Sequence, residues 1–291
     1  MGSFFADLST NPFLLTGLLA GLFASVACGT VGPYVVTRRL VFLSGAIAHI
    51  AIGGVGAAIF LRYQWPDLFS ALTPLAGGAV AALLSAPLLA VLRHHVSERL
   101  DTVVGALWAS GMAIGLLLIK LTPGYHSELM SYLFGNLVYV SRGDVAALAA
   151  LAAVVVGVTV LFHRRFLAVC LDPLQARLQG ISVLWTDVVL LSLVALTVIS
   201  LTRVVGLILV IALLSLPSAT AGRLVPRLAS MMWLATALCV FLTTVPRIAV
   251  YGTVVSPEPA IVLAATAVYL VALALPARWR GGGGGEGQAR G

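Results

Sequence analysis

The chain has 291 residues and a formal net charge of +7, from 17 lysines and arginines against 10 aspartates and glutamates. Hydrophobic residues make up 60% of it and charged residues 9%, whereas a soluble globular domain carries roughly 45–50% and about 25%. So few charges cannot cover a water-soluble surface of this size. The composition therefore excludes an ordinary soluble enzyme, a nucleic-acid-binding protein and a disordered chain, and it predicts an all-α protein that crosses a lipid bilayer several times.

Apolar runs long enough for membrane-spanning helices recur along the whole chain. A helix that crosses a bilayer needs about 20 mostly apolar residues. Such runs fall near residues 12–36, 41–61, 71–92, 103–119, 144–162, 186–202, 204–222, 229–250 and 259–277. The weakest break lies at Thr202 and Arg203, where a single arginine separates two runs. We expect eight or nine spans in one transmembrane domain over residues 1–280, followed by a flexible, glycine-rich tail at 281–291.

The basic residues fall mainly on one side of this layout. With nine spans and the N-terminus outside, the inner loops hold Arg38, Arg39, Arg93, Arg99, Arg164, Arg165, Arg177, Arg223, Arg227, Arg278, Arg280 and Arg290. The outer side holds Arg62, Lys120, Arg142, Arg203 and Arg247. An excess of this kind is typical of cytoplasmic loops. The sequence thus predicts which ends of the spans face the cytoplasm.

The predicted outer segment 121–143 is more than a simple turn. It is too polar to span the membrane, and its aromatic residues are unusual for a plain linker. His126 and Glu128 lie within it and are candidate metal ligands at an outer entrance. The alternative is that both are solvated loop residues.

The predicted inner segment, about 163–184, contains the signals of a short helix. Asp172 can cap the helix, Pro173 fits its first position and Gly180 can end it, with Ala176 and Arg177 between them. A short amphipathic helix on the cytoplasmic face can dock a soluble partner. The alternative is an ordinary connecting helix.

His49 is the clear ionisable residue within the predicted spans. Ionisable groups at membrane depth are costly and tend to be functional. A neutral imidazole is a common transition-metal ligand and can also relay protons. The alternative role is a hydrogen bond to a neighbouring helix. Gly53 and Gly54 follow on the same run, where small residues let helix backbones approach closely and allow distortion.

A second polar cluster surrounds Pro217, with Ser215, Ser218 and Thr220. The proline removes one backbone hydrogen bond and frees a carbonyl about four residues earlier. The three hydroxyl groups can bond such freed groups. This pattern favours a bend on which a helix bundle can hinge over direct metal ligation.

Motifs of catalysis are absent from the sequence. It contains no G-x-x-x-x-G-K-[ST] phosphate-binding loop, no H-E-x-x-H zinc motif and no spacing that marks a nucleophile. We therefore expect no catalytic residues. A chain of many spans without a catalytic set is most simply a transport pathway.

Five motifs occur in an order that resembles one family. They are Tyr34-Val35-Val36-Thr37-Arg38-Arg39-Leu40, the Gly-Ala-Ile-Ala-His stretch that ends at His49, Asp101–Gly105 with Gly111–Gly115, Tyr132-Leu133-Phe134-Gly135-Asn136, and Val205–Val210 continuing to Pro217–Ala221. With these motifs, over about residues 14–275, the chain resembles the permease subunits of ABC importers for zinc, manganese and iron.

The resemblance implies the ABC metal-importer permease fold in a bacterial inner membrane, as a permease homodimer. It implies a cytoplasmic ABC ATPase dimer docked on the segment 172–180, and an extracytoplasmic metal-binding protein that delivers the cargo. The cargo would be a divalent metal, zinc or manganese, imported by ATP-driven alternating access. ATP hydrolysis would take place on a separate subunit, and no cofactor would be permanently bound.

The chain departs from the family pattern at one position. The family usually has an acidic residue four positions before the membrane histidine, and here that position is Gly45. Without that carboxylate, manganese is disfavoured relative to zinc, because manganese prefers oxygen ligands. Two alternatives stay open: a permease of the same fold for a metal chelate or other cargo, and an ATP-independent secondary carrier in which His49 relays protons.

Overall fold

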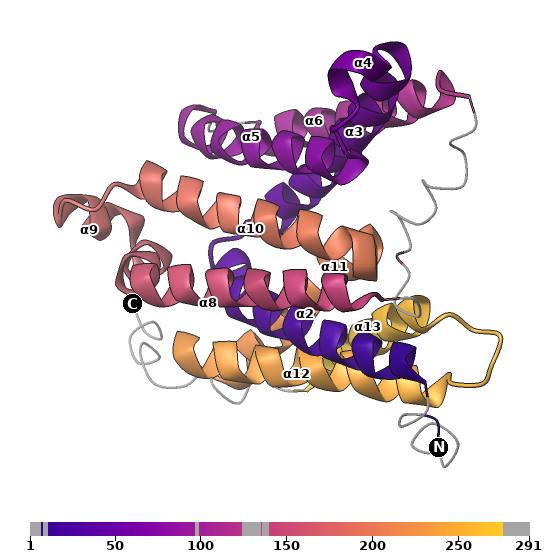
Figure 1. Cartoon of the computed structure of the whole chain (residues 1–291). Coiled ribbons are helices and arrows are strands. Elements are labelled where there is room, and N and C mark those ends of the chain that lie inside the picture. Colours follow the sequence, from indigo (N-terminus) through magenta and orange to yellow (C-terminus); the bar gives the residue numbers. More distant parts are fainter. Residues whose placement is uncertain (1–6, 8–10, 97–98, 124–134, 136–139, 276–291) are drawn as a thin grey trace, which may run out of the picture.

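The computed structural model describes residues 7, 11–96, 99–123, 135 and 140–275. This part of the chain is helical and contains no strand (Figure 1). In chain order the helices are α2 (Pro12–Thr37), α3 (Val41–Gln64), α4 (Pro66–Phe69), α5 (Pro74–His95), α6 (Leu100–Lys120), α8 (Arg142–Leu171), α9 (Pro173–Leu178), α10 (Val183–Val205), α11 (Leu207–Leu224), α12 (Leu228–Ala249) and α13 (Pro257–Ala274). The predicted tail at 281–291 lies outside the described residues.

Nine helices of the described part are long and apolar enough to cross a membrane: α2, α3, α5, α6, α8, α10, α11, α12 and α13. Each coincides with one predicted run, so the all-α membrane architecture is confirmed. The short helices α4 and α9 lie between spans. The first turn of α2 and the short helix α9 lie at opposite ends of the bundle (Figure 1), as the predicted sidedness requires.

Two predicted boundaries are wrong. The sixth and seventh spans separate at Gly206, because this glycine adopts a φ of +81° that other residues rarely adopt. Arg203 does not end α10, because an arginine adopts helical backbone angles as readily as its neighbours do. Helix α8 continues past the predicted end at 162 to Leu171, because neither glycine nor proline follows Gly157 in this stretch.

Side-chain caps fix where several spans begin. The Asn11 side chain accepts a hydrogen bond from the Phe13 amide at 3.0 Å, just ahead of α2. Ser141 and Asp144 form a capping box at the start of α8, in which the Asp144 amide donates to the Ser141 hydroxyl at 3.1 Å. Such caps satisfy amide groups that have no partner within the helix.

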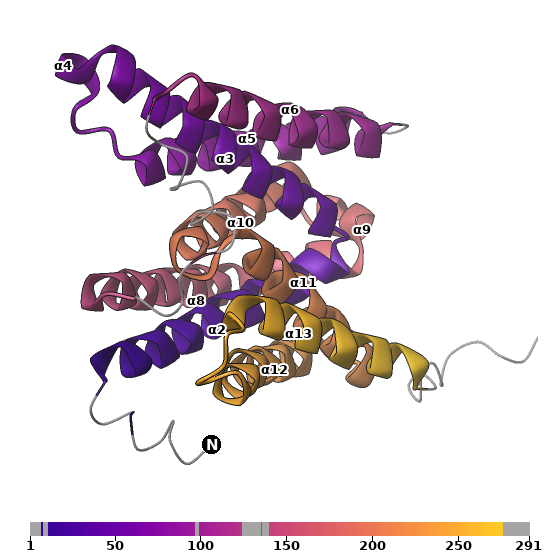
Figure 2. The same ribbon diagram turned by 90° about the vertical axis from the view of Figure 1, so that its right-hand side faces the viewer.

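The helices form two groups joined by α10. Helices α3, α5 and α6 lie together on one side, helices α2, α8, α11, α12 and α13 lie on the other, and α10 lies between them (Figure 2). Gly53 and Gly54 account for the tight packing of the first group. A Cβ atom on Gly54 would lie 2.4 Å from the Gly77 carbonyl oxygen of α5, and one on Gly53 would lie 2.7 Å from that of Gly111 in α6. Only glycine allows these backbones to meet so closely.

Candidate functional site

His49 lies on α3, and two contacts orient its imidazole. Its Nδ1 atom lies 2.8 Å from the carbonyl oxygen of Gly45, one turn earlier on the same helix. Because a carbonyl oxygen only accepts, Nδ1 carries the proton and Nε2 keeps its lone pair. The ring also lies against the indole of Trp108 from α6, with ring centroids 4.4 Å apart. The half-buried imidazole therefore has the tautomer that a metal ligand needs.

Trp108 also explains the glycine at position 45. A Cβ atom on Gly45 would lie 2.6 Å from the Cζ3 atom of this indole and 2.8 Å from Cη2. Any side chain at position 45 would require the indole to move. The packing of α6 on α3 thus excludes a carboxylate one turn before His49.

His49 is the only predicted metal ligand that falls within the described residues. Within the described residues, no three histidine, cysteine, aspartate or glutamate side chains lie close enough together to hold a metal ion. His126 and Glu128 lie outside the described residues. Of the predicted ligands, the described part of the chain thus places His49 alone.

The Pro217 region differs in one respect from the sequence prediction. The hydroxyls of Ser215 and Thr220 donate to the carbonyls of Ile211 and Leu216, each one turn earlier on α11. The carbonyl that Pro217 frees belongs to Leu213. It accepts instead from the Cys239 thiol of α12 at 3.5 Å. A contact from the next helix along the chain therefore satisfies this carbonyl.

Unlike Ser215 and Thr220, Ser218 does not bond a carbonyl of its own helix. Its side chain is fully buried, and its hydroxyl has no hydrogen-bond partner among the described residues. A Cβ atom on Gly32 of α2 would lie 2.2 Å from this hydroxyl oxygen. Ser218 thus sits where α11 crosses α2 at close range.

Gly135 of the outer segment meets the joint between α10 and α11. A Cβ atom on Gly135 would lie 2.4 Å from the Gly206 amide nitrogen and 2.6 Å from the Val205 carbonyl oxygen. Both glycines have positive φ, +77° and +81°. Gly135 and Val205, which are 70 positions apart in the sequence, therefore touch backbone to backbone at a buried helix break.

Helix α9 begins and ends as the sequence predicts. The Asp172 carboxylate accepts from the amides of Leu174 and Gln175 at 2.8 and 3.1 Å, and Pro173 occupies the first helical position. Gly180 ends the segment with a φ of +78°. Ala176 is buried and packs against Val169 of α8 and Val183 of α10.

The exposed surface of α9 carries large apolar side chains beside the polar Gln175 and Arg177. Leu174 is 68% exposed and Leu178 is 82% exposed, and Leu171 and Trp185 beside them are also exposed. A cavity of about 600 Å³ lies between α8 and the turn that leads from α9 into α10, with Phe162 and Arg165 in its wall. Large apolar side chains on a short helix outside the predicted membrane spans form a surface that a partner can cover.

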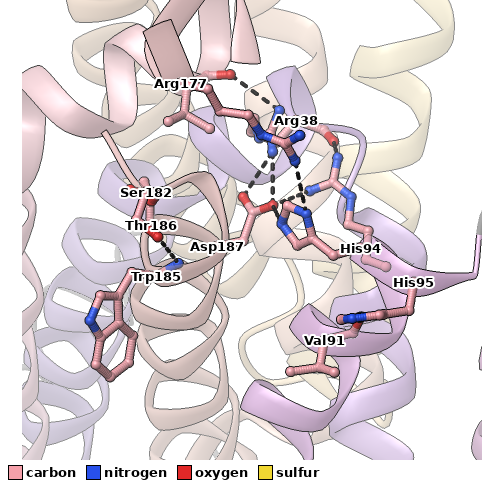
Figure 3. Close-up of polar contacts among 11 residues, drawn as sticks. Arg38, Val91, His94, His95, Arg177, Ser182, Trp185, Thr186 and Asp187 are labelled. Carbon is pink, nitrogen blue, oxygen red and sulfur yellow. Dashed lines mark hydrogen bonds and ion pairs between the residues drawn. The ribbon is translucent and has the colours of Figure 1, made fainter. Parts of the chain in front are cut away.

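A buried ion cluster lies beside α9, and the sequence reasoning missed it. The Asp187 carboxylate of α10 is only 1% exposed. Arg38, at the end of α2, donates from one nitrogen to both carboxylate oxygens at 2.9 and 2.8 Å, and Arg93 of α5 donates at 3.1 Å (Figure 3). His94 lies 3.5 Å from the same carboxylate. Arg38 and Arg93, which the sequence places in cytoplasmic loops, are therefore also ion-pair partners of Asp187.

The signal for this cluster was present in the sequence. Apart from Asp144 at the first position of the fifth run, Asp187 is the only acidic residue within the nine predicted runs. A buried carboxylate requires cationic partners. Which cations supply them could not be read from one sequence, because Arg38, Arg93 and Asp187 lie on three different helices.

The fold defines a multi-pass membrane protein, with His49 within a span and the Asp187 cluster at one end of the bundle. Residues 10–276 match the ABC 3 transport family. The chain therefore belongs to the ABC 3 transport family.

Named relatives and a solved structure agree with this assignment. A "probable metal transport system membrane protein" of Chlamydia muridarum is 37% identical over 79% of this chain and 79% of its own. The "manganese transport system membrane protein MntC" of Halalkalibacterium halodurans is 28% identical over 80% of this chain and 76% of its own. The structure "PsaBC from Streptococcus pneumoniae in complex with Fab" matches with a TM-score of 0.81 and 25% identity, over 94% of this chain and 95% of that chain.

Proposed function

We propose that this chain is the membrane permease subunit of an ABC importer for a divalent metal ion. The observation that carries the proposal is the match of residues 10–276 to a transport family, in a sequence that contains no phosphate-binding loop. ATP hydrolysis then takes place on separate ATPase subunits, and the permease itself has no catalytic role. The names of the related proteins, which specify metal transport, support a metal as cargo.

Helix α9 is the proposed docking site for the ATPase subunits. The exposed Leu174 and Leu178 give it large apolar side chains on its outer surface at the predicted cytoplasmic end. Its cap at Asp172 and its anchor at Ala176 hold it against α8 and α10. A soluble ATPase that covers these leucines would remove them from water, which is favourable by about 25 cal/mol per Å² of apolar surface.

His49 is the proposed metal ligand of the translocation path. Its Nε2 lone pair is available because Nδ1 is bonded to the Gly45 carbonyl. Zinc tolerates nitrogen ligands, and manganese prefers oxygen. Since Trp108 excludes a carboxylate at position 45, the geometry at His49 favours zinc over manganese.

The partners complete the proposed cycle. An extracytoplasmic metal-binding protein delivers the ion to a permease homodimer, and His126 and Glu128 are proposed to contact the ion at its outer entrance. ATP-driven closure of the ATPase dimer then displaces α9 and opens the path inward, with Pro217 and Gly206 as points where the helices bend.

Uptake into proteoliposomes tests the function. The permease is reconstituted with its ATPase subunits and its metal-binding protein, and radioactive zinc and manganese are supplied outside. ATP-dependent accumulation of a metal ion is the expected result, and no accumulation of either ion overturns the proposal. Uptake of a chelate alone assigns the chelate cargo instead, and proton-driven uptake without the ATPase assigns a secondary carrier.

A further inference from the structure

We infer that Asp187 is the positioning residue that anchors the inner end of the path by which a displacement of α9 reaches the helix that carries His49. The inference rests on the proposed function, because it assigns a residue to the coupling between ATPase and metal path. Neither the family match nor the names of the relatives assigns this residue a role. The argument starts from what surrounds the carboxylate.

Asp187 draws together the predicted cytoplasmic ends of four spans. Arg38 binds the carboxylate from the end of α2 and also donates to the Val169 carbonyl of α8 at 3.1 Å. Arg93 binds it from the last turn of α5 and donates to the Arg38 carbonyl at 3.0 Å. Each arginine thus bridges Asp187 to a backbone carbonyl on another part of the bundle. Removing the carboxylate would leave two guanidinium groups near each other without a counter-ion.

Helix α9 contacts this cluster through His94. The Arg177 guanidinium donates to Nδ1 of His94 at 3.2 Å. Nδ1 is therefore the acceptor, and the proton of the neutral ring sits on Nε2, which lies 3.5 Å from the Asp187 carboxylate. Figure 3 shows this series of side chains, from Arg177 through His94 to Asp187. Movement of α9 consequently acts on His94 and on its neighbour Arg93 in the same turn of α5.

Helix α5 passes the displacement to α3. A Cβ atom on Gly54 of α3 would lie 2.4 Å from the Gly77 carbonyl of α5, and one on Gly77 would lie 2.5 Å from the Gly54 carbonyl. Backbones in such contact cannot slide independently. His49 lies on α3 little more than one turn before Gly54. The path α9–α5–α3 is therefore made of direct contacts, and Asp187 fixes its inner end against α10 and α2.

The first experiment needs no cargo. Amide hydrogen exchange is measured by mass spectrometry on the purified permease and on its Arg177→Ala, Arg177→Lys and Arg142→Ala variants. We expect Arg177→Ala to speed exchange in residues 90–95 and 183–187 as well as in α9, and Arg177→Lys to restore protection. Arg142→Ala removes the same charge from an exposed position at the opposite end of α8 and should leave these amides protected. Faster exchange in α9 alone would overturn the inference.

The second experiment measures coupling. Asp187→Asn and Arg62→Ala complexes are reconstituted, and ATP consumed per metal ion imported is determined. We expect Asp187→Asn to retain its ATPase subunits but to consume at least about tenfold more ATP per ion, with Arg62→Ala at the wild-type ratio. If Asp187→Asn does not assemble, His94→Ala replaces it. An unchanged ratio overturns the inference. A wild-type complex without metal uptake overturns the proposed function instead, and hydrogen exchange then decides the inference.

Discussion

The imidazole of His49 lies on the indole of Trp108, with the two ring planes inclined by 33°. The same indole fills the space beside Gly45, whose carbonyl holds the Nδ1 proton of that histidine. One tryptophan of α6 therefore sets both the orientation of the candidate ligand and the absence of a side chain next to it.

Adding a methyl group at position 45 tests this packing. Gly45→Ala would force the indole away, at a cost of about 1–3 kcal/mol for an overpacked core, and should lower the melting temperature of the purified permease. Gly45→Ala combined with Trp108→Leu should recover part of that loss. Gly157→Ala, where nothing lies within 4 Å of the added atom, is the matched control. An equal effect of Gly45→Ala and Gly157→Ala would contradict the packing.

Removal of the imidazole tests the metal path. His49→Ala should lower metal uptake by at least about tenfold, since even the loss of a group that only orients a metal ligand has an effect of that size, while the permease still assembles with its partners. His95→Ala is a close control, because the Nδ1 atom of His95 also meets a carbonyl four residues earlier, at 2.9 Å, but on an exposed surface. Equal uptake by both variants would make His49 a packing residue.

The contact between Gly135 and Gly206 gives a third prediction. Gly135→Ala places a methyl group against the Gly206 backbone and also forces alanine into a left-handed conformation, which costs about 1–2 kcal/mol by itself. Gly252→Ala isolates the conformational cost, because Gly252 has a φ of +78° and open space around it. The melting temperature of Gly135→Ala should therefore fall further than that of Gly252→Ala. If both variants lose the same number of degrees in melting temperature, the contact between Gly135 and Gly206 contributes nothing to stability.

The leucines of α9 give a fourth prediction. Leu178→Ser should reduce the amount of ATPase that co-purifies with the permease, since it replaces an exposed apolar group of the docking surface. Leu68→Ser changes a leucine of similar exposure, 76% against 82%, on α4 at the other end of the bundle. It should retain the ATPase. Undiminished binding by Leu178→Ser would remove α9 from the interface.

The spans were predictable because each needs only local information, namely a long apolar run. The ends of α9 were predictable for a similar reason: Asp172, Pro173 and Gly180 act on residues within the same short segment. The break at Gly206 was misplaced because the charge of Arg203 is conspicuous in sequence, whereas backbone geometry decides where a helix ends.

The groups that the sequence reasoning missed depend on partners that lie on other helices. Asp187 lies 149 residues from Arg38, and the Cys239 thiol reaches a carbonyl on another helix. No local pattern specifies which arginine meets an acid, or which side chain bonds the carbonyl freed by Pro217. The role of Gly45 was equally hidden, because it depends on the position of Trp108.

Helix α10 has the buried Asp187 near its inner end and the helix break at Gly206 directly after its outer end. With 23 residues the helix measures about 34 Å. A rigid helix that pivots at Gly206 moves most at its far end, near Asp187. A small rotation at the outer joint would therefore displace the ion cluster much further than it displaces the residues around Gly206.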